Sequence, residues 1–158
     1  MTLEIRQLTR HDVALMEALL GTFADAFDDA DTYNGNRPSA EYLRELLGGD
    51  AFIALVALKN GHVVGGIAAY VLKKFEQQRS EICIYDLAVA LIHRREGVAT
   101  ALIEKLKQVA AARGAYVIFV QADTGVEDEP AIALYTKLGK REDVLHFDLE
   151  VKPLDGAD

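Results

Sequence analysis

The sequence has few of the residues that build disulfides or metal centres. It contains one cysteine, four histidines and no tryptophan among 158 residues. Cys83 has no partner for an internal disulfide, and the histidines show no metal-ligand spacing with it. Because Cys83 lies in the apolar stretch EICIYDLAV, the simplest interpretation is a buried, unreactive thiol. We therefore predict no metal site and assign this cysteine no chemistry.

Long hydrophobic runs are also absent. No apolar run reaches the roughly 18 residues that indicate a membrane-spanning helix. The N-terminus, MTLEIRQLTRHD, has acidic residues early and lacks the apolar core and cleavage site of a secretory signal. With 51% hydrophobic and 27% charged side chains, the composition is that of a folded domain. We expect one soluble, cytoplasmic domain over residues 1–158, without a membrane partner.

Positive charge is scarce relative to negative charge. There are 17 lysines and arginines against 25 acids, a net charge of −8, which disfavours nucleic acid as a partner. The excess acids fall in two short segments without a basic residue. These acids are Asp25, Asp28, Asp29 and Asp31 in one segment, and Asp123, Glu127, Asp128 and Glu129 in the other. The segments predict a cationic partner or, alternatively, solvated loops and acids at helix N-termini.

Hydrophobic periodicity predicts a chain that mixes strands and helices. Strands are expected at residues 3–8, 52–58, 63–72, 82–89, 116–122 and 144–151. Helices are expected at two places between the first two strands, and over residues 98–113 and 130–138. The Asn60-Gly61 pair predicts a tight hairpin turn. The order predicts a mixed α/β fold with a central, mostly antiparallel sheet flanked by helices.

The turn that leads from the strand at 82–89 into the helix at 98 carries the clearest chemical signal. Unpaired backbone N–H groups and the helix dipole make such a turn an anion site. Gly97 and Ala99 would let a phosphate approach the backbone closely. Alternatively, these small residues ease the packing of the helix on the sheet. The turn matches neither the Walker pattern GxxxxGK[ST] nor the dinucleotide pattern GxGxxG.

Three motifs in this region and beyond it resemble those of the GNAT superfamily of N-acetyltransferases. Arg94, Gly97 and Ala99 match its pyrophosphate signature of Arg or Gln, two residues, Gly, one residue, Gly or Ala. The sequence LAV at 87–89 resembles the splayed strand whose backbone receives acetyl-pantetheine, and AIALYTKLG at 131–139 resembles the later helix of the family.

The resemblance implies a GNAT-like fold, splayed after the strand at 82–89, that uses acetyl-coenzyme A (acetyl-CoA) as cosubstrate and no metal. The residues that it implies for cofactor binding are Leu87, Ala88, Val89, Arg94, Arg95, Glu96, Gly97, Val98, Ala99 and Thr100.

Within this superfamily the chain resembles the gentamicin-type aminoglycoside 3-N-acetyltransferases. The similar segments are FDDADTY at 27–33, IYDLAV at 84–89 and ALYTKLG at 133–139. This resemblance implies acetyl transfer to the 3-amine of the deoxystreptamine ring, and hence antibiotic resistance. It also admits a homodimer, because many relatives dimerise.

The same resemblance accounts for both acidic segments as recognition sites for a small polycationic aminoglycoside. Many superfamily members carry Asn ahead of the Ala-x-x-Leu-Tyr helix, where this sequence has Asp128, and the acid favours a substrate role over a cofactor role. The residues expected to bind the substrate are Asp28, Asp31, Asp123, Glu127, Asp128 and Glu129.

Asp86 is the candidate general base for direct attack of the amine, acting itself or through water. Strand alternation places it on the face of Ile82 and Ile84, unless a bulge re-aims it toward the cleft. A carboxylate on an apolar face must be satisfied or functional. The alternative is therefore a structural carboxylate that accepts backbone hydrogen bonds.

Tyr135 is the candidate general acid, because its phenol can protonate the departing thiolate of coenzyme A. Alternatively it is a core aromatic, since Ala131, Leu134 and Leu138 supply an ordinary apolar helix face.

Two other functions remain open from the sequence. The chain could acetylate another small polyamine or a protein lysine, using the same cofactor site and a different cleft. It could also bind coenzyme A, or a cationic partner, without catalysis. Release of coenzyme A with a panel of amines separates these three functions.

Overall fold

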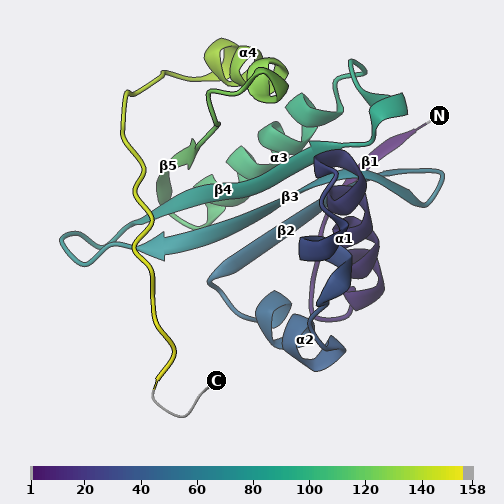
Figure 1. The fold of residues 1–158 in the computed structure, drawn as a ribbon, viewed down its shortest axis with the longest axis horizontal. Coiled ribbons are helices and arrows are strands. Elements are labelled where there is room, and N and C mark those ends of the chain that lie inside the picture. The colour runs from purple at the N-terminus through teal and green to yellow at the C-terminus, as the bar shows by residue number, and fades with distance from the viewer. Residues whose placement is uncertain (1, 155–158) are drawn as a thin grey trace. The chain divides into compact units, whose positions relative to one another are not determined.

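The computed structural model describes residues 2–154 (Figure 1). The chain divides into two compact units, Met1–Gln121 and Ala122–Asp158, and each is described by itself. Within the described residues, no helix has the length and apolar character needed to cross a membrane.

The first unit holds the sheet and three of the four α-helices. Its elements in chain order are β1 (Leu3–Gln7), α1 (Val13–Phe27), the π-helical turn η1 (Asp31–Gly35), α2 (Ala40–Gly48), β2 (Phe52–Lys59), β3 (His62–Lys73), β4 (Ser80–Val89), the 3-10 turn η2 (Leu91–His93), α3 (Val98–Ala112) and β5 (Ala115–Val120). The second unit contains the short turn η3 (Val126–Asp128) followed by α4 (Glu129–Leu138).

The five strands form one mixed sheet in the order β1-β2-β3-β4-β5. Neighbouring strands are antiparallel except β4 and β5, which are parallel and are joined through α3. Asn60 and Gly61 both adopt positive φ angles, 52° and 78°, which is the backbone of a tight hairpin turn between β2 and β3. The mixed α/β fold, the mostly antiparallel sheet and this turn were all predicted from the sequence and are confirmed.

Helices cover both faces of the sheet. β2 is buried on both sides, and alternate residues of it, Phe52, Ala54, Val56 and Leu58, form one core cluster with side chains of α1 and α2. α3 contacts β2, β3 and β4 and buries a stripe at helical spacing that includes Val98, Leu102 and Leu106. The central strands are therefore enclosed between helices on both faces of the sheet.

The strand predicted over residues 144–151 is wrong. Residues 140–154 adopt neither helix nor strand. The large hydrophobic side chains of this stretch stay exposed, from 71% at Val144 to 88% at Val151. Alternation of apolar and polar residues decides which side chains share a face, but it supplies no neighbouring strand to pair the backbone.

Candidate active site

A β-bulge in β4 determines where Asp86 lies. In the register between β3 and β4, Ala69 is opposite Ile84 and Ala68 is opposite Asp86, so Tyr85 is an extra residue without a partner. Without this bulge, alternation would place Asp86 on the face of Ile84, which is 4% exposed. The bulge shifts Asp86 to the other face, as the sequence analysis allowed.

On that face the Asp86 carboxylate meets the segment that follows α1. Tyr33 of η1 donates a hydrogen bond from its Oη to Asp86 Oδ2, at 3.0 Å. Asp86 is half-buried, and Ala68 opposite it belongs to the core cluster that includes Phe23 of α1. Burial raises the pKa of Asp86 above its usual value, and the bond from Tyr33 opposes that rise. A half-buried carboxylate with a raised pKa is suited to accept a proton from an ammonium group.

Aromatic rings surround this carboxylate. Tyr33 packs against Phe23 and Phe27, with ring centroids 5.8 and 5.7 Å apart. Tyr70 on β3 meets Tyr85 edge to face at 5.7 Å. Sequence reasoning did not assign a role to Tyr33, although the segment 27–33 that contains it carried the family resemblance.

β4 and β5 separate from each other close to the same bulge. The register between β4 and β5 ends with Ile84 opposite Val120, so β4 continues to Val89 beyond that pairing. Ala90 donates its backbone N–H to Val64 on β3, and by alternation the backbone groups of Leu87 and Val89 face the open side. The predicted splay of the sheet is confirmed, and it leaves an edge that can receive an extended ligand.

The turn after β4, which we call the anion cradle, has the backbone geometry of an anion site. Arg95 and Gly97 adopt left-handed φ angles of 64° and 83°, and an added Cβ at Gly97 would meet nothing within 4 Å. No side chain of the described residues caps the N-terminus of α3, so its first N–H groups are available to an anion. Val98 is 2% exposed and can contribute only through its backbone, while Ala99 and Thr100 lie in the same first turn.

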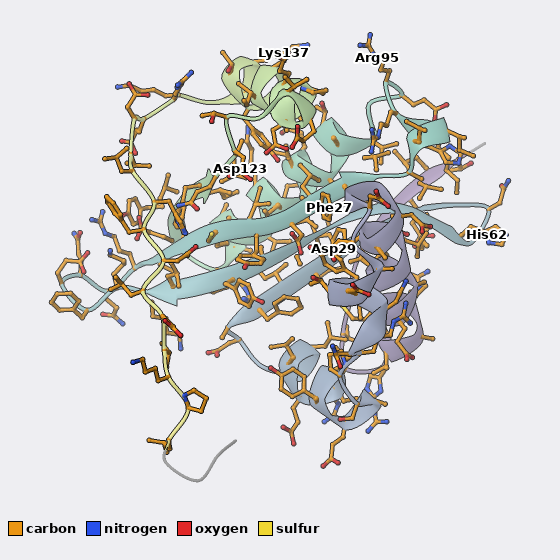
Figure 2. The ribbon with its side chains drawn as sticks, in the orientation of Figure 1. Phe27, Asp29, His62, Arg95, Asp123 and Lys137 are labelled. Carbon is orange, nitrogen blue, oxygen red and sulfur yellow. The ribbon has the colours of Figure 1, made fainter. Side chains whose placement is uncertain are left out.

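The two arginines of this turn lie differently. Arg94 donates from Nε to the carbonyl oxygen of Val89, at 3.1 Å, and so ties the turn to the end of β4. The Arg95 side chain points away from the fold (Figure 2).

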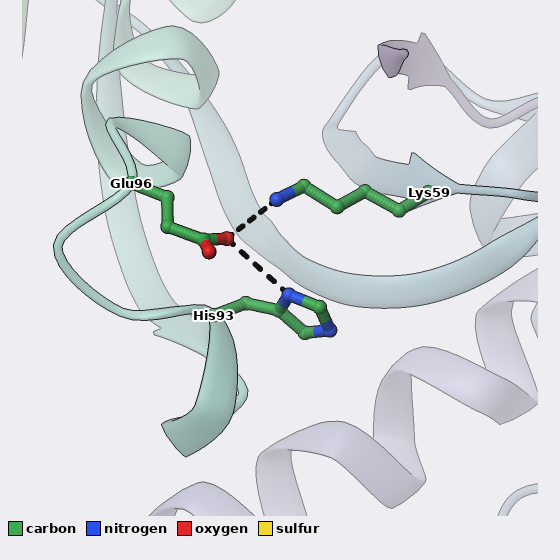
Figure 3. A network of polar contacts seen from close by, with 3 residues as sticks. All are labelled: Lys59, His93 and Glu96. Carbon is green, nitrogen blue, oxygen red and sulfur yellow. Dashed lines mark hydrogen bonds and ion pairs between the residues drawn. The ribbon is translucent and has the colours of Figure 1, made fainter. Parts of the chain in front are cut away.

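A charged cluster holds Glu96 (Figure 3). Lys59 Nζ at the end of β2 lies 2.5 Å from Glu96 Oε1, and His93 Nδ1 lies 3.3 Å from the same oxygen. The hydrogen bonds from Lys59 and then His93 lower the pKa of Glu96. The carboxylate is therefore ionised and paired, which ties the turn to the end of β2.

The first acidic segment surrounds the approach to Tyr33. Asp28 ends α1 in a left-handed conformation with φ 50°, and Asp28 and Asp31 are exposed. Asp29 is half-buried, and its Oδ1 accepts the backbone N–H of Thr32 at 3.2 Å. The exposed carboxylates are thus available to a cation, while Asp29 shapes the turn.

The second unit holds the other acidic segment and Tyr135. Asp128 accepts the backbone N–H of Asp123 at 2.8 Å and so closes the loop before α4, while Glu127 and Glu129 are exposed. Burial, with a smaller contribution from the charge of Asp128, raises the pKa of Tyr135 to about 12. The phenol therefore stays protonated at neutral pH and can donate.

A family model and similar solved structures both identify the chain with acetyltransferases. The model described as the acetyltransferase (GNAT) family matches residues 14–140. An aminoglycoside acetyltransferase from an uncultured soil metagenomic sample is 68% identical, with a TM-score of 0.95 over 96% of this chain and 100% of that chain. Another such enzyme from a soil metagenomic sample, solved in complex with sisomicin, is 31% identical, with a TM-score of 0.86 over 95% of this chain and 97% of that one.

Curated relatives are more distant. N-acetyltransferase family 8 member 3 of Mus musculus is 30% identical over 100 residues, which are 63% of this chain and 43% of the mouse protein. The chain therefore spans less than half the length of that relative.

A bulky side chain at Gly97 should block the anion cradle. We predict that Gly97→Val weakens acetyl-CoA binding by more than about tenfold, because the side chain would occupy the space above the first turn of α3 and the left-handed backbone would be strained. Isothermal titration calorimetry with acetyl-CoA measures this loss.

Gly114→Val is the matched control. Gly114 follows Arg113, the C-cap of α3, with φ 74°, and it also has no atom within 4 Å of an added Cβ, so it carries the same backbone cost away from the cradle. Equal acetyl-CoA affinity for both folded variants would contradict the assignment.

Proposed function

Because this chain belongs to the GNAT family of acetyltransferases, we propose that it transfers the acetyl group of acetyl-CoA to the 3-amine of the deoxystreptamine ring of aminoglycoside antibiotics. Such a reaction would confer resistance to those antibiotics. The observation that carries the proposal is the 68% identity to an aminoglycoside acetyltransferase over nearly the whole chain. The family match extends over both units, which supports a single acetyltransferase domain over residues 1–158. We further propose that this domain acts in the cytoplasm.

The open end of β4 and the first turn of α3 fit acetyl-CoA. The strand segment Leu87, Ala88 and Val89 would hold the pantetheine arm, because the backbone groups of Leu87 and the N–H of Val89 face the open edge beyond the β5 pairing. Uncapped N–H groups and the open space above Gly97 suit a pyrophosphate. The residues of the cradle are Arg94, Arg95, Glu96, Gly97, Val98, Ala99 and Thr100. When bound, acetyl-CoA supplies a thioester activated toward an amine.

Asp86 is the base in this proposal. An aminoglycoside amine is protonated near neutral pH and must lose its proton before it can attack a carbonyl carbon. The half-buried carboxylate of Asp86, with its raised pKa, accepts that proton directly or through water. The free amine then forms the new carbon–nitrogen bond and loses a second proton to solvent as the carbon–sulfur bond breaks, and solvent later returns a proton to the Tyr135 phenolate.

Tyr135 is the acid in this proposal. The departing coenzyme A thiolate needs a proton, and a phenol whose pKa is about 12 carries one throughout the physiological range. The neutral phenol also adds no negative charge beside a developing thiolate.

The acidic residues attract the substrate. Asp28 and Asp31 are exposed beside the segment that bears Tyr33, and Glu127 and Glu129 are exposed at the start of α4. Each segment by itself, the second with Asp123 and Asp128 included, would attract a molecule that carries several ammonium groups.

Coenzyme A release over a panel of amines tests the proposal. We predict thiol release with sisomicin and gentamicin, and at least about tenfold lower kcat/KM with spermidine and with a lysine peptide, because these lack the ring that presents several ammonium groups together. Mass spectrometry and NMR of the product locate the acetyl group. Turnover that favours spermidine or the peptide would reject the aminoglycoside assignment, and no turnover with any amine would reject an enzyme.

Loss of the base and loss of the acid should differ in their pH dependence. We predict that Asp86→Asn lowers kcat most at low pH, where the substrate amine is protonated, with a maximum loss of about 100- to 10,000-fold. Tyr135→Phe should lower kcat at all pH values below the phenol pKa and leave acetyl-CoA affinity unchanged. Steady-state kinetics between pH 5.5 and 9 on both variants, roughly the range in which amines and carboxylates of this kind titrate, makes the comparison. Full activity of either variant across this range would remove the corresponding role.

A further inference from the structure

The hydrogen bond between Tyr33 and Asp86 joins two segments that are distant in the sequence. Tyr33 lies on η1 after α1, and Asp86 lies at the bulge of β4. The bond engages Oδ2 of the carboxylate at 3.0 Å, which leaves Oδ1 as the oxygen to meet a substrate amine. A single donor from a fixed ring therefore decides how the carboxylate is oriented.

The Tyr33 ring is held from several sides. Its packing against Phe23 and Phe27 restrains the ring plane. Its backbone N–H donates to the carbonyl oxygen of Asp29 at 3.3 Å, and its own carbonyl accepts from Arg37 Nε at 3.3 Å. Packing and backbone hydrogen bonds thus fix the position of the Tyr33 phenol. The hydrogen bond from this phenol in turn orients the Asp86 carboxylate.

The groups around the pair are acids and phenols. Asp29 follows α1 on the same side as Tyr33, Tyr70 faces the site from β3, and Tyr85 precedes Asp86 on β4. Burial first, and then the charge of Asp86 and the bond to it, raise the pKa of Tyr33, so the phenol remains a donor. The same bond lowers the pKa of Asp86 against the effect of burial.

We propose that Tyr33 is a positioning residue that orients the Asp86 carboxylate and keeps it ready to accept a proton at neutral pH. This inference rests on the proposed role of Asp86 as the base. A carboxylate buried without that donor would stay protonated to a higher pH and would lose its fixed orientation. Tyr33 would therefore extend the pH range of the reaction toward the acid side.

Tyr33→Phe tests the inference, because it removes the hydroxyl and keeps the ring that packs on Phe23 and Phe27. The acid limb of the kcat/KM profile should move to higher pH by about one unit. Activity on the acid side should fall about tenfold, while activity at the alkaline plateau should stay within about twofold of the original protein. Acetyl-CoA affinity should not change.

Replacing Tyr33 with 3-fluorotyrosine gives a second arm that keeps the hydroxyl and almost the same volume. Fluorine makes the phenol a stronger donor, so the acid limb should move to lower pH, opposite to Tyr33→Phe. Tyr70→Phe is the matched control, because it removes a phenol near Asp86 that packs on Phe52 and Tyr85 without bonding to the carboxylate. Its acid limb should stay in place.

The outcomes separate this inference from the proposed function. Tyr33→Phe with an unshifted profile, beside a strongly defective Asp86→Asn, would overturn the role of Tyr33 and leave the base in place. An equal loss of kcat at every pH would reduce Tyr33 to a structural residue and would also overturn the inference. Full activity of Asp86→Asn would remove the proposed base and, with it, the role of Tyr33.

Discussion

The single extra residue in β4 is the constraint on which the site depends. β4 must bury Ile82 and Ile84 on one face, and a carboxylate two residues further along that face would be desolvated among apolar side chains. The bulge at Tyr85 removes this conflict by turning Asp86 to the face where the Tyr33 hydroxyl meets it. The proposed base is thus half-buried rather than fully buried, and its remaining desolvation raises the pKa of its carboxyl group.

The same place in β4 is where the sheet opens. Pairing with β5 ends at Ile84, one residue before the bulge, so Asp86 and the open edge at Leu87 and Val89 are consecutive features of one strand. The turn beyond them is fixed by Arg94 on the Val89 carbonyl and by Lys59 on Glu96. The proposed base, the open edge and the anion cradle therefore all lie within residues 86–100, and contacts with neighbouring elements hold this stretch in place.

Local signals in the sequence were enough to predict much of this arrangement. Asn60-Gly61 needs no partner to favour its turn, because its residue types alone suit the positive φ angles that the turn adopts. The sequence could not predict whether β4 contains a bulge, because the register of a strand depends on its neighbouring strand. No role was predicted for Tyr33, because its contact with Asp86 joins residues 53 positions apart in the sequence. The strand predicted at 144–151 does not form, because alternation of apolar and polar residues does not provide a strand to pair with.

The central claim is that the bulge creates a half-buried carboxylate able to act as a base. Carbon-13 NMR titration of the aspartate carboxyl groups, with the Asp86 signal assigned by its loss in Asp86→Asn, measures this property in the free protein. The account predicts that Asp86 titrates above its ordinary value of 3.8. A titration at or below that value would contradict the claim, because the carboxylate would then be solvated or held by stronger donors and would be a poor acceptor for the proton of an ammonium group.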